Sequence, residues 1–100
     1  MFVVRMTALA VDDLEELWLY VSEHDVDAAD RVVDGVSGLI NLLSAQPEMG
    51  TPRDDLGLGL RCLVHKRRFL VFYRFKNGVV EVLRILRGER FLTSGLFDEL

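Results

Sequence analysis

The sequence has too few metal-binding and disulfide-forming side chains to build either kind of site. Cys62 is the single cysteine, so an internal disulfide is excluded. The two histidines, His24 and His65, lie far apart from each other, and with one cysteine they do not supply the four ligands of a structural zinc site. We interpret Cys62 as an ordinary strand residue and expect no bound metal.

Long hydrophobic runs are also missing. No apolar stretch approaches the ~20 residues that a helix needs to cross a bilayer. The first residues lack the basic start, apolar stretch and small-residue cleavage site of a signal peptide. We therefore expect a cytoplasmic protein without a membrane association.

The motifs of common catalytic sites do not occur either. No glycine-rich phosphate loop is followed by a lysine, and no histidine has the spacing of a metal ligand or a catalytic triad. We interpret both histidines as incidental, and we predict no catalytic residue and no cofactor.

What the sequence does contain is typical of one globular domain. Its 100 residues are 50% hydrophobic and 28% charged, which is a folded rather than a disordered composition. We expect a single domain over residues 1–100. A chain of this length has a small stability margin, so a bound partner would add substantially to it.

Charge is divided unevenly along the chain. Residues 1–50 carry two basic and ten acidic side chains, a formal charge of −8, whereas residues 51–100 carry ten basic and six acidic ones, a charge of +4. This division favours a polar partner for the basic half. The alternative is that each half has a solvated face and the two neutralise one another.

Two helices are predicted in the first half. Residues 2–6 are apolar and valine-rich, as in a strand, and Thr7 can cap a helix over residues 8–24. Asp27 is the expected cap of a second helix over residues 28–46, which Pro47 ends. Acidic side chains, Asp13 included, are expected mainly on the solvated side of the first helix. The apolar stripes comprise Ala10, Leu14, Leu17, Trp18 and Val21 in the first helix and Val32, Val36, Leu39, Ile40 and Leu43 in the second.

Three strands are predicted after a loop over residues 47–59. They cover residues 60–65, 68–75 and 79–87, with a tight connection at Lys66-Arg67 and a hairpin at Asn77-Gly78. Short connections produce an antiparallel meander. The predicted fold class is therefore α+β, with an N-terminal strand and an αα-hairpin packed on a C-terminal antiparallel sheet. Gly35 and Gly38 would also allow a close approach of another helix.

Aromatic side chains lie among the arginines of the predicted strands. Such a surface can hold phosphates and stack bases, or it can form a protein interface. The plainer alternative is that the aromatic rings are core and the arginines are solvated. Arg84 interrupts the apolar run from Val82 to Leu86, so we expect partial burial and a carboxylate or carbonyl partner, with a structural and a functional role both open.

Six stretches resemble the ParE branch of the RelE/ParE toxins over nearly the whole chain, and their order and spacing are more specific than any one of them. The stretches are residues 10–21 (AVDDLEELWLYV), 28–33 (AADRVV), 42–53 (LLSAQPEMGTPR), 59–61 (GLR), 69–74 (FLVFYR) and 82–90 (VLRILRGER).

The resemblance implies a toxin of a type II toxin–antitoxin system with a RelE/ParE-like fold. ParE-like toxins poison DNA gyrase by binding it, and a ParD-like antitoxin neutralises them by wrapping an extended segment around the toxin. The resemblance also implies that the complex binds operator DNA through the antitoxin. The candidate target-binding residues are Arg61, Arg84, Arg87, Arg90 and Phe91. The candidate antitoxin-binding residues are Leu14, Trp18, Val36 and Phe69.

Two other functions stay open. RelE-like toxins cut mRNA in the ribosome with basic residues and a C-terminal tyrosine. Arg90 occupies a comparable place, but no tyrosine follows Tyr73, and the phenylalanines of the tail have no hydroxyl for proton transfer. A ribosome-dependent endoribonuclease is therefore the alternative. A degenerate member that only binds its antitoxin is the third hypothesis.

Overall fold

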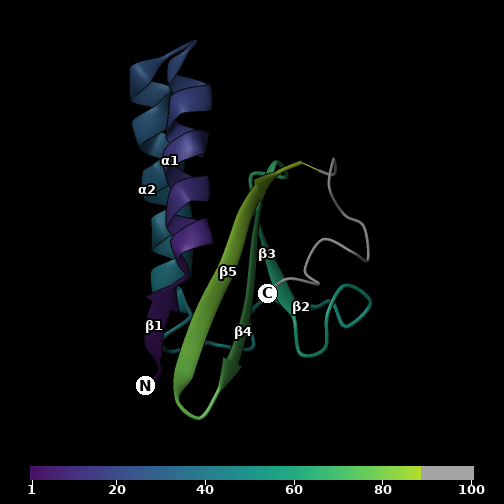
Figure 1. Ribbon diagram of the computed structural model, residues 1–100. Coiled ribbons are helices and arrows are strands. Elements are labelled where there is room, and N and C mark those ends of the chain that lie inside the picture. The colour runs from purple at the N-terminus through teal and green to yellow at the C-terminus, as the bar shows by residue number, and fades with distance from the viewer. Residues whose placement is uncertain (89–100) are drawn as a thin grey trace.

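A computed structural model describes residues 1–88 as two helices packed on a five-stranded sheet (Figure 1). The α+β architecture predicted from the sequence is confirmed. The elements are β1 (Val3–Met6), α1 (Ala8–Ser22), α2 (Val26–Leu42), β2 (Thr51–Pro52), β3 (Arg61–His65), β4 (Phe69–Lys76) and β5 (Val79–Arg87).

Local side-chain caps decide where the two helices begin. Thr7 accepts a hydrogen bond from the Ala10 N–H at 3.0 Å and caps α1, as predicted. The prediction of Asp27 as the second cap is wrong, because Asp25 accepts the bond from the Ala28 N–H at 3.2 Å. α2 therefore begins at Val26. It ends at Leu42, four residues before the predicted end, and turns fill the segment before Pro47.

The sheet has the order β1-β5-β4-β3-β2. β3, β4 and β5 form the predicted antiparallel meander. β1 joins parallel to β5, with Val3 opposite Val79 and Met6 opposite Val82. Neither this parallel pairing nor the two-residue strand β2 was predicted. The helical hairpin supplies the long crossover that parallel neighbours require.

Left-handed backbone conformations make both tight turns of the meander. Asn77 and Gly78 have φ values of 52° and 78°, which confirms the predicted hairpin. Lys66 and Arg67 have φ values of 52° and 59° and connect β3 to β4. Both turns are exposed. The turns at the strand ends fix the registers of β3, β4 and β5.

Each sheet face carries its own apolar cluster. The helix-facing cluster joins the stripes of α1 and α2 to β4 and β5, with Val36, Leu43 and Tyr73 fully buried. On the other face, Leu56 and Leu60 of the loop before β3 pack with Cys62, Phe72 and Leu83. The first cluster confirms the predicted burial of the helical hairpin on the sheet. The second explains why β4 is apolar on both sides over residues 69–73.

The close approach at the α2 glycines involves a histidine rather than a helix. A Cβ atom on Gly35 would lie 2.5 Å from the His65 ring, whereas one on Gly38 would meet no atom within 4 Å. The expectation of a helix–helix approach is therefore wrong, because β3 places His65 against this turn of α2. Within residues 1–88, no helix has the length and apolar character needed to cross a membrane.

Candidate functional site

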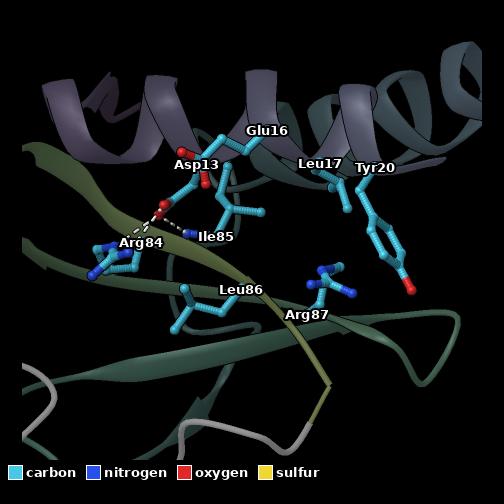
Figure 2. A pocket seen from close by; sticks show the side chains of 8 residues that line it. All are labelled: Asp13, Glu16, Leu17, Tyr20, Arg84, Ile85, Leu86 and Arg87. Carbon is cyan, nitrogen blue, oxygen red and sulfur yellow. Dashed lines mark hydrogen bonds and ion pairs between the residues drawn. The ribbon is translucent and has the colours of Figure 1, made fainter. Parts of the chain in front are cut away.

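A buried carboxylate joins α1 to β5. Asp13 has 9% exposure and accepts three hydrogen bonds (Figure 2). Arg84 donates two of them, from Nε to Oδ2 at 2.7 Å and from Nη2 to Oδ1 at 3.0 Å. The Ile85 N–H donates the third, at 2.9 Å. The expectation that Asp13 faces solvent with the other acids of α1 is thus wrong.

The end of β1 and an irregularity in β5 create this arrangement. β1 ends opposite Val82, so β5 has no neighbouring strand on that side from Leu83 onward. Phe72 pairs with Arg84 and Tyr73 pairs with Val82, which leaves Leu83 as the extra residue of a β-bulge. A bulge bends its strand and changes the direction of the side chains beside it. In this chain the bulge lies directly before Arg84, and the Arg84 side chain reaches Asp13 of α1.

The carboxylate partner that the sequence predicted for Arg84 is therefore Asp13. The hydrogen bonds that Arg84 donates to Asp13 raise the pKa of Arg84, and the charges of Asp13 and Glu16 act in the same direction, against the effect of burial. Side-chain exposures of 22% for Arg84 and 9% for Asp13 place the pair mostly out of water. Losing one partner of such a pair costs about 3 kcal/mol, because the other charge stays buried and unpaired. This pair is structural whether or not it also contacts a target.

A pocket lies beside this ion pair, between α1 and β5. It has a volume of about 370 Å³. Figure 2 shows Arg84 and Asp13 at one end and Arg87 beneath Tyr20 at the other. The guanidinium carbon of Arg87 lies 3.6 Å from the centre of the Tyr20 ring, a cation–π contact. The lining residues are Asp13, Glu16, Leu17, Tyr20, Arg84, Ile85, Leu86 and Arg87.

Arg61 belongs to a separate part of the molecule. Its Nη1 donates to the carbonyls of Glu48 and Gly50 at 3.0 and 2.7 Å, and its guanidinium lies over Phe75 at 5.6 Å. These contacts hold the loop before β2. The structure therefore brings Arg84 and Arg87 together and places Arg61 elsewhere. Arg90 and Phe91 lie outside the described residues.

Tyr73 and Cys62, whose side-chain types often take part in catalysis, are buried in the core. The Tyr73 hydroxyl donates to the Pro47 carbonyl at 2.7 Å and accepts from the Gly50 N–H at 2.8 Å, and burial raises its pKa. Burial also raises the pKa of Cys62 to about 11, so its thiol stays protonated near neutral pH. Residues 1–88 contain no group of three His, Cys, Asp or Glu side chains placed to hold a metal.

Known proteins share the sequence pattern and the fold of this chain. The family model described as the ParE toxin of the type II toxin-antitoxin system parDE matches residues 4–91. The chain belongs to the ParE toxin family. Toxin ParE3 of Caulobacter vibrioides is 34% identical over 85 residues, which cover 84% of each protein. A chain of the chromosomal ParDE TA system from P. aeruginosa matches with a TM-score of 0.76 at 25% identity, covering 89% of this chain and 98% of that one.

In this ParE-family chain, the four candidate antitoxin contacts differ in how much surface they offer. Leu14 is half-buried against the core, and Trp18 is half-buried with its indole N–H donating to Asp30 at 2.8 Å. Val36 is fully buried and Phe69 is 4% exposed. The structure corrects the last two assignments, because both side chains are core and present no surface to a partner in this conformation.

Sequence reasoning missed both the pocket and the apolar residues that the ParE-family fold leaves exposed. Ala10, Asp13 and Leu17 are the buried residues of α1, and their helical spacing was the available signal that Asp13 faces inward. No comparable signal indicated that Tyr20 would cover Arg87. Exposed apolar side chains of the helical hairpin are Leu9, Val11, Leu19, Val26 and Leu42.

Proposed function

We propose that this chain arrests growth by binding DNA gyrase, performs no chemistry of its own, and is neutralised by a ParD-like antitoxin in the cytoplasm. The single observation that carries the proposal is the pocket between α1 and β5, which ends in the Arg87 cation stacked on Tyr20. Membership of the ParE toxin family supports the toxin role.

Arg87 is the cation of this site that is best placed for a target. The charge of Arg84 is neutralised by Asp13, whereas Arg87 is held by a ring without a carboxylate partner among residues 1–88. Arg87 also lies at the end of β5, directly before the segment with the candidate residues Arg90 and Phe91. A stacked, positioned cation loses little side-chain freedom when it contacts a carboxylate or phosphate. The target surface would therefore include Arg87 and the residues that follow it.

The antitoxin is proposed to cover the apolar residues that the helical hairpin exposes. Leu19 and Val26 are 58% and 53% exposed near the connection between α1 and α2. A groove that receives apolar anchors from a partner helix or strand is a common mode of peptide recognition. Operator DNA would contact the antitoxin, because this chain has a net charge of −4 and residues 1–50 carry most of its acids.

Purified chain, gyrase and plasmid DNA test the target directly. The proposal expects cleaved DNA–gyrase complexes to accumulate with increasing toxin, and it expects Arg87→Ala to reduce them several-fold. Arg31→Ala is the matched control, because it removes an exposed arginine from α2, away from the pocket. Normal supercoiling at saturating toxin would reject gyrase as the target. Position-specific mRNA cuts in a translation extract would favour the endoribonuclease alternative.

A further inference from the structure

The turn between β3 and β4 carries three consecutive cations. Lys66, Arg67 and Arg68 are exposed, and none of them has an ion-pair partner among residues 1–88. The guanidinium carbon of Arg68 lies 5.9 Å from the centre of the Phe69 ring, a contact that supports the cation without neutralising it. We call these three residues the basic turn. Their charge is therefore available to a partner.

The backbone of the basic turn has a conformation that its residues do not favour. Lys66 and Arg67 are both left-handed, with φ values of 52° and 59°, a region that residues other than glycine and asparagine rarely adopt. The second hairpin of the same sheet places Asn77 and Gly78 in this conformation, as turn chemistry predicts. Folding alone therefore does not explain a lysine and an arginine here. Residues that go against a local preference in this way are expected at functional positions.

The basic turn lies beside the end of β5. Phe69 pairs with His65 on one side and with Arg87 on the other, and the Gly88 N–H donates to the Arg68 carbonyl. Figure 1 shows the turn and the end of β5 at the same end of the sheet, opposite the β4–β5 hairpin. Because neighbouring strands are ~4.8 Å apart, the end of the sheet from β3 to β5 is about 10 Å wide. The basic turn thus extends the surface that we assign to the target at Arg87.

The composition of the basic turn fits a phosphate backbone better than a protein surface. The centre of a protein interface is depleted of charged residues, and lysine is rare there, whereas no apolar side chain interrupts the basic turn. Duplex DNA carries one phosphate per ~3.4 Å along each strand, so a surface about 10 Å wide meets roughly three of them. Lysine and arginine hold such phosphates without reading the bases. The ligand chemistry is therefore that of a nucleic acid backbone.

We propose that the basic turn contacts the phosphate backbone of the duplex DNA that gyrase holds, while Arg87 contacts gyrase itself. The inference rests on the proposed binding of gyrase. The net charge of −4 opposes binding of the free chain to DNA, but a chain already on gyrase meets the DNA at a high effective concentration. The chain therefore binds gyrase with DNA more tightly than gyrase alone, and added salt reduces this difference because the contact is electrostatic.

One double variant removes the charge of the basic turn and keeps its backbone. Lys66→Asn with Arg67→Gly introduces the residue pair that the β4–β5 hairpin uses in the same conformation, so the turn should fold at least as well. Arg5→Gln with Lys76→Gln is the matched control. It removes two exposed cations from the half of the sheet nearer the β4–β5 hairpin, so both double variants have the same net charge.

The measurement is the affinity of each chain for purified gyrase, with and without linear duplex DNA, over a salt range in which gyrase stays on its DNA. The wild-type chain and the control should bind about tenfold more tightly when DNA is present at low salt. The basic-turn variant should lose most of this gain. The slope of log affinity against log salt for the DNA-bound enzyme should also decrease by about 2, since each lost phosphate contact removes about 0.9.

The outcomes separate this inference from the proposed function. A wild-type chain that binds gyrase equally well with and without DNA would overturn the DNA contact alone. An equal loss of affinity of the basic-turn variant for gyrase without DNA would assign the turn to an acidic protein surface and overturn it as well. A chain that binds gyrase in neither condition would reject the proposed function too. Binding to ribosomes that the basic-turn variant loses would then assign the turn to RNA.

Discussion

Asp13 of α1 and Arg84 of β5 are separated by 71 residues in the chain and form a two-bond ion pair between helix and sheet. The same carboxylate satisfies the Ile85 N–H at the edge where β1 has ended. Asp13 therefore replaces a missing strand neighbour, and it positions one end of the pocket that we assign to partner binding.

Removing the Asp13 carboxylate should destabilise the fold. Asp13→Ala leaves the Arg84 charge and the Ile85 N–H without a partner, so we expect a loss of about 3 kcal/mol in the free energy of unfolding. Denaturant titration measures it. Arg84→Met in the same chain removes the unpaired charge and should recover part of the loss. A double variant no more stable than Asp13→Ala alone would contradict the assignment of the pair.

The two glycines of α2 should respond in opposite ways to the same substitution. Gly35→Ala places a methyl group 2.5 Å from the His65 ring, so we expect a loss of about 1–3 kcal/mol from overpacking. Gly38→Ala enters open space and should be neutral or stabilising by up to about 1 kcal/mol, because alanine favours the helix. Thermal unfolding of both variants checks the contrast. Equal effects would show that His65 does not restrict this turn of α2.

The Tyr73 hydroxyl should matter for the loop that precedes β2. Tyr73→Phe leaves the buried Gly50 N–H without an acceptor and the Pro47 carbonyl without its donor. We expect a loss of about 1–3 kcal/mol by denaturant titration, since an unsatisfied buried donor costs that much. The Gly50 amide should also exchange faster with solvent. Unchanged stability and exchange would mean that water replaces the hydroxyl.

Burial of Cys62 should make stability fall at alkaline pH. Its folded pKa of about 11 lies above the 9.0 of an ordinary cysteine thiol, so the unfolded chain loses this proton first as pH rises. The stabilising contribution is complete below pH 9, decreases between pH 9 and 11, and is lost above that window. Burial also raises the pKa of Tyr73, so this phenol likewise lowers stability at alkaline pH. The decisive measurement is thus the difference in pH dependence between the wild-type chain and Cys62→Ala. Parallel curves would contradict the assignment to Cys62.

Local patterns in the sequence predicted most of the architecture. Neighbouring residues alone decide the Thr7 cap, the Asn77-Gly78 hairpin and the apolar stripe through Ile40. The sequence was therefore sufficient to predict all three. The parallel pairing of β1 and the strand β2 depend on contacts between distant segments, which no local pattern encodes.

The candidate site was harder to predict from the sequence for the same reason. The sequence indicated that Arg84 needs a partner, but the identity of that partner required the relative placement of α1 and β5. Val36 and Phe69 were assigned to a surface although they are core. An apolar side chain that binds a partner and one that fills a core follow the same periodicity, so the pattern alone does not separate them.

Growth after tightly controlled expression of the chain, with and without its antitoxin, is the most direct test of gyrase binding as the cause of toxicity. We predict arrest with filamentation and a DNA-damage response, rescued by the antitoxin and weakened by Arg87→Ala but not by Arg31→Ala. Arrest with rapid loss of translation and no damage response would contradict it in favour of the ribonuclease, and continued normal growth would indicate a degenerate toxin.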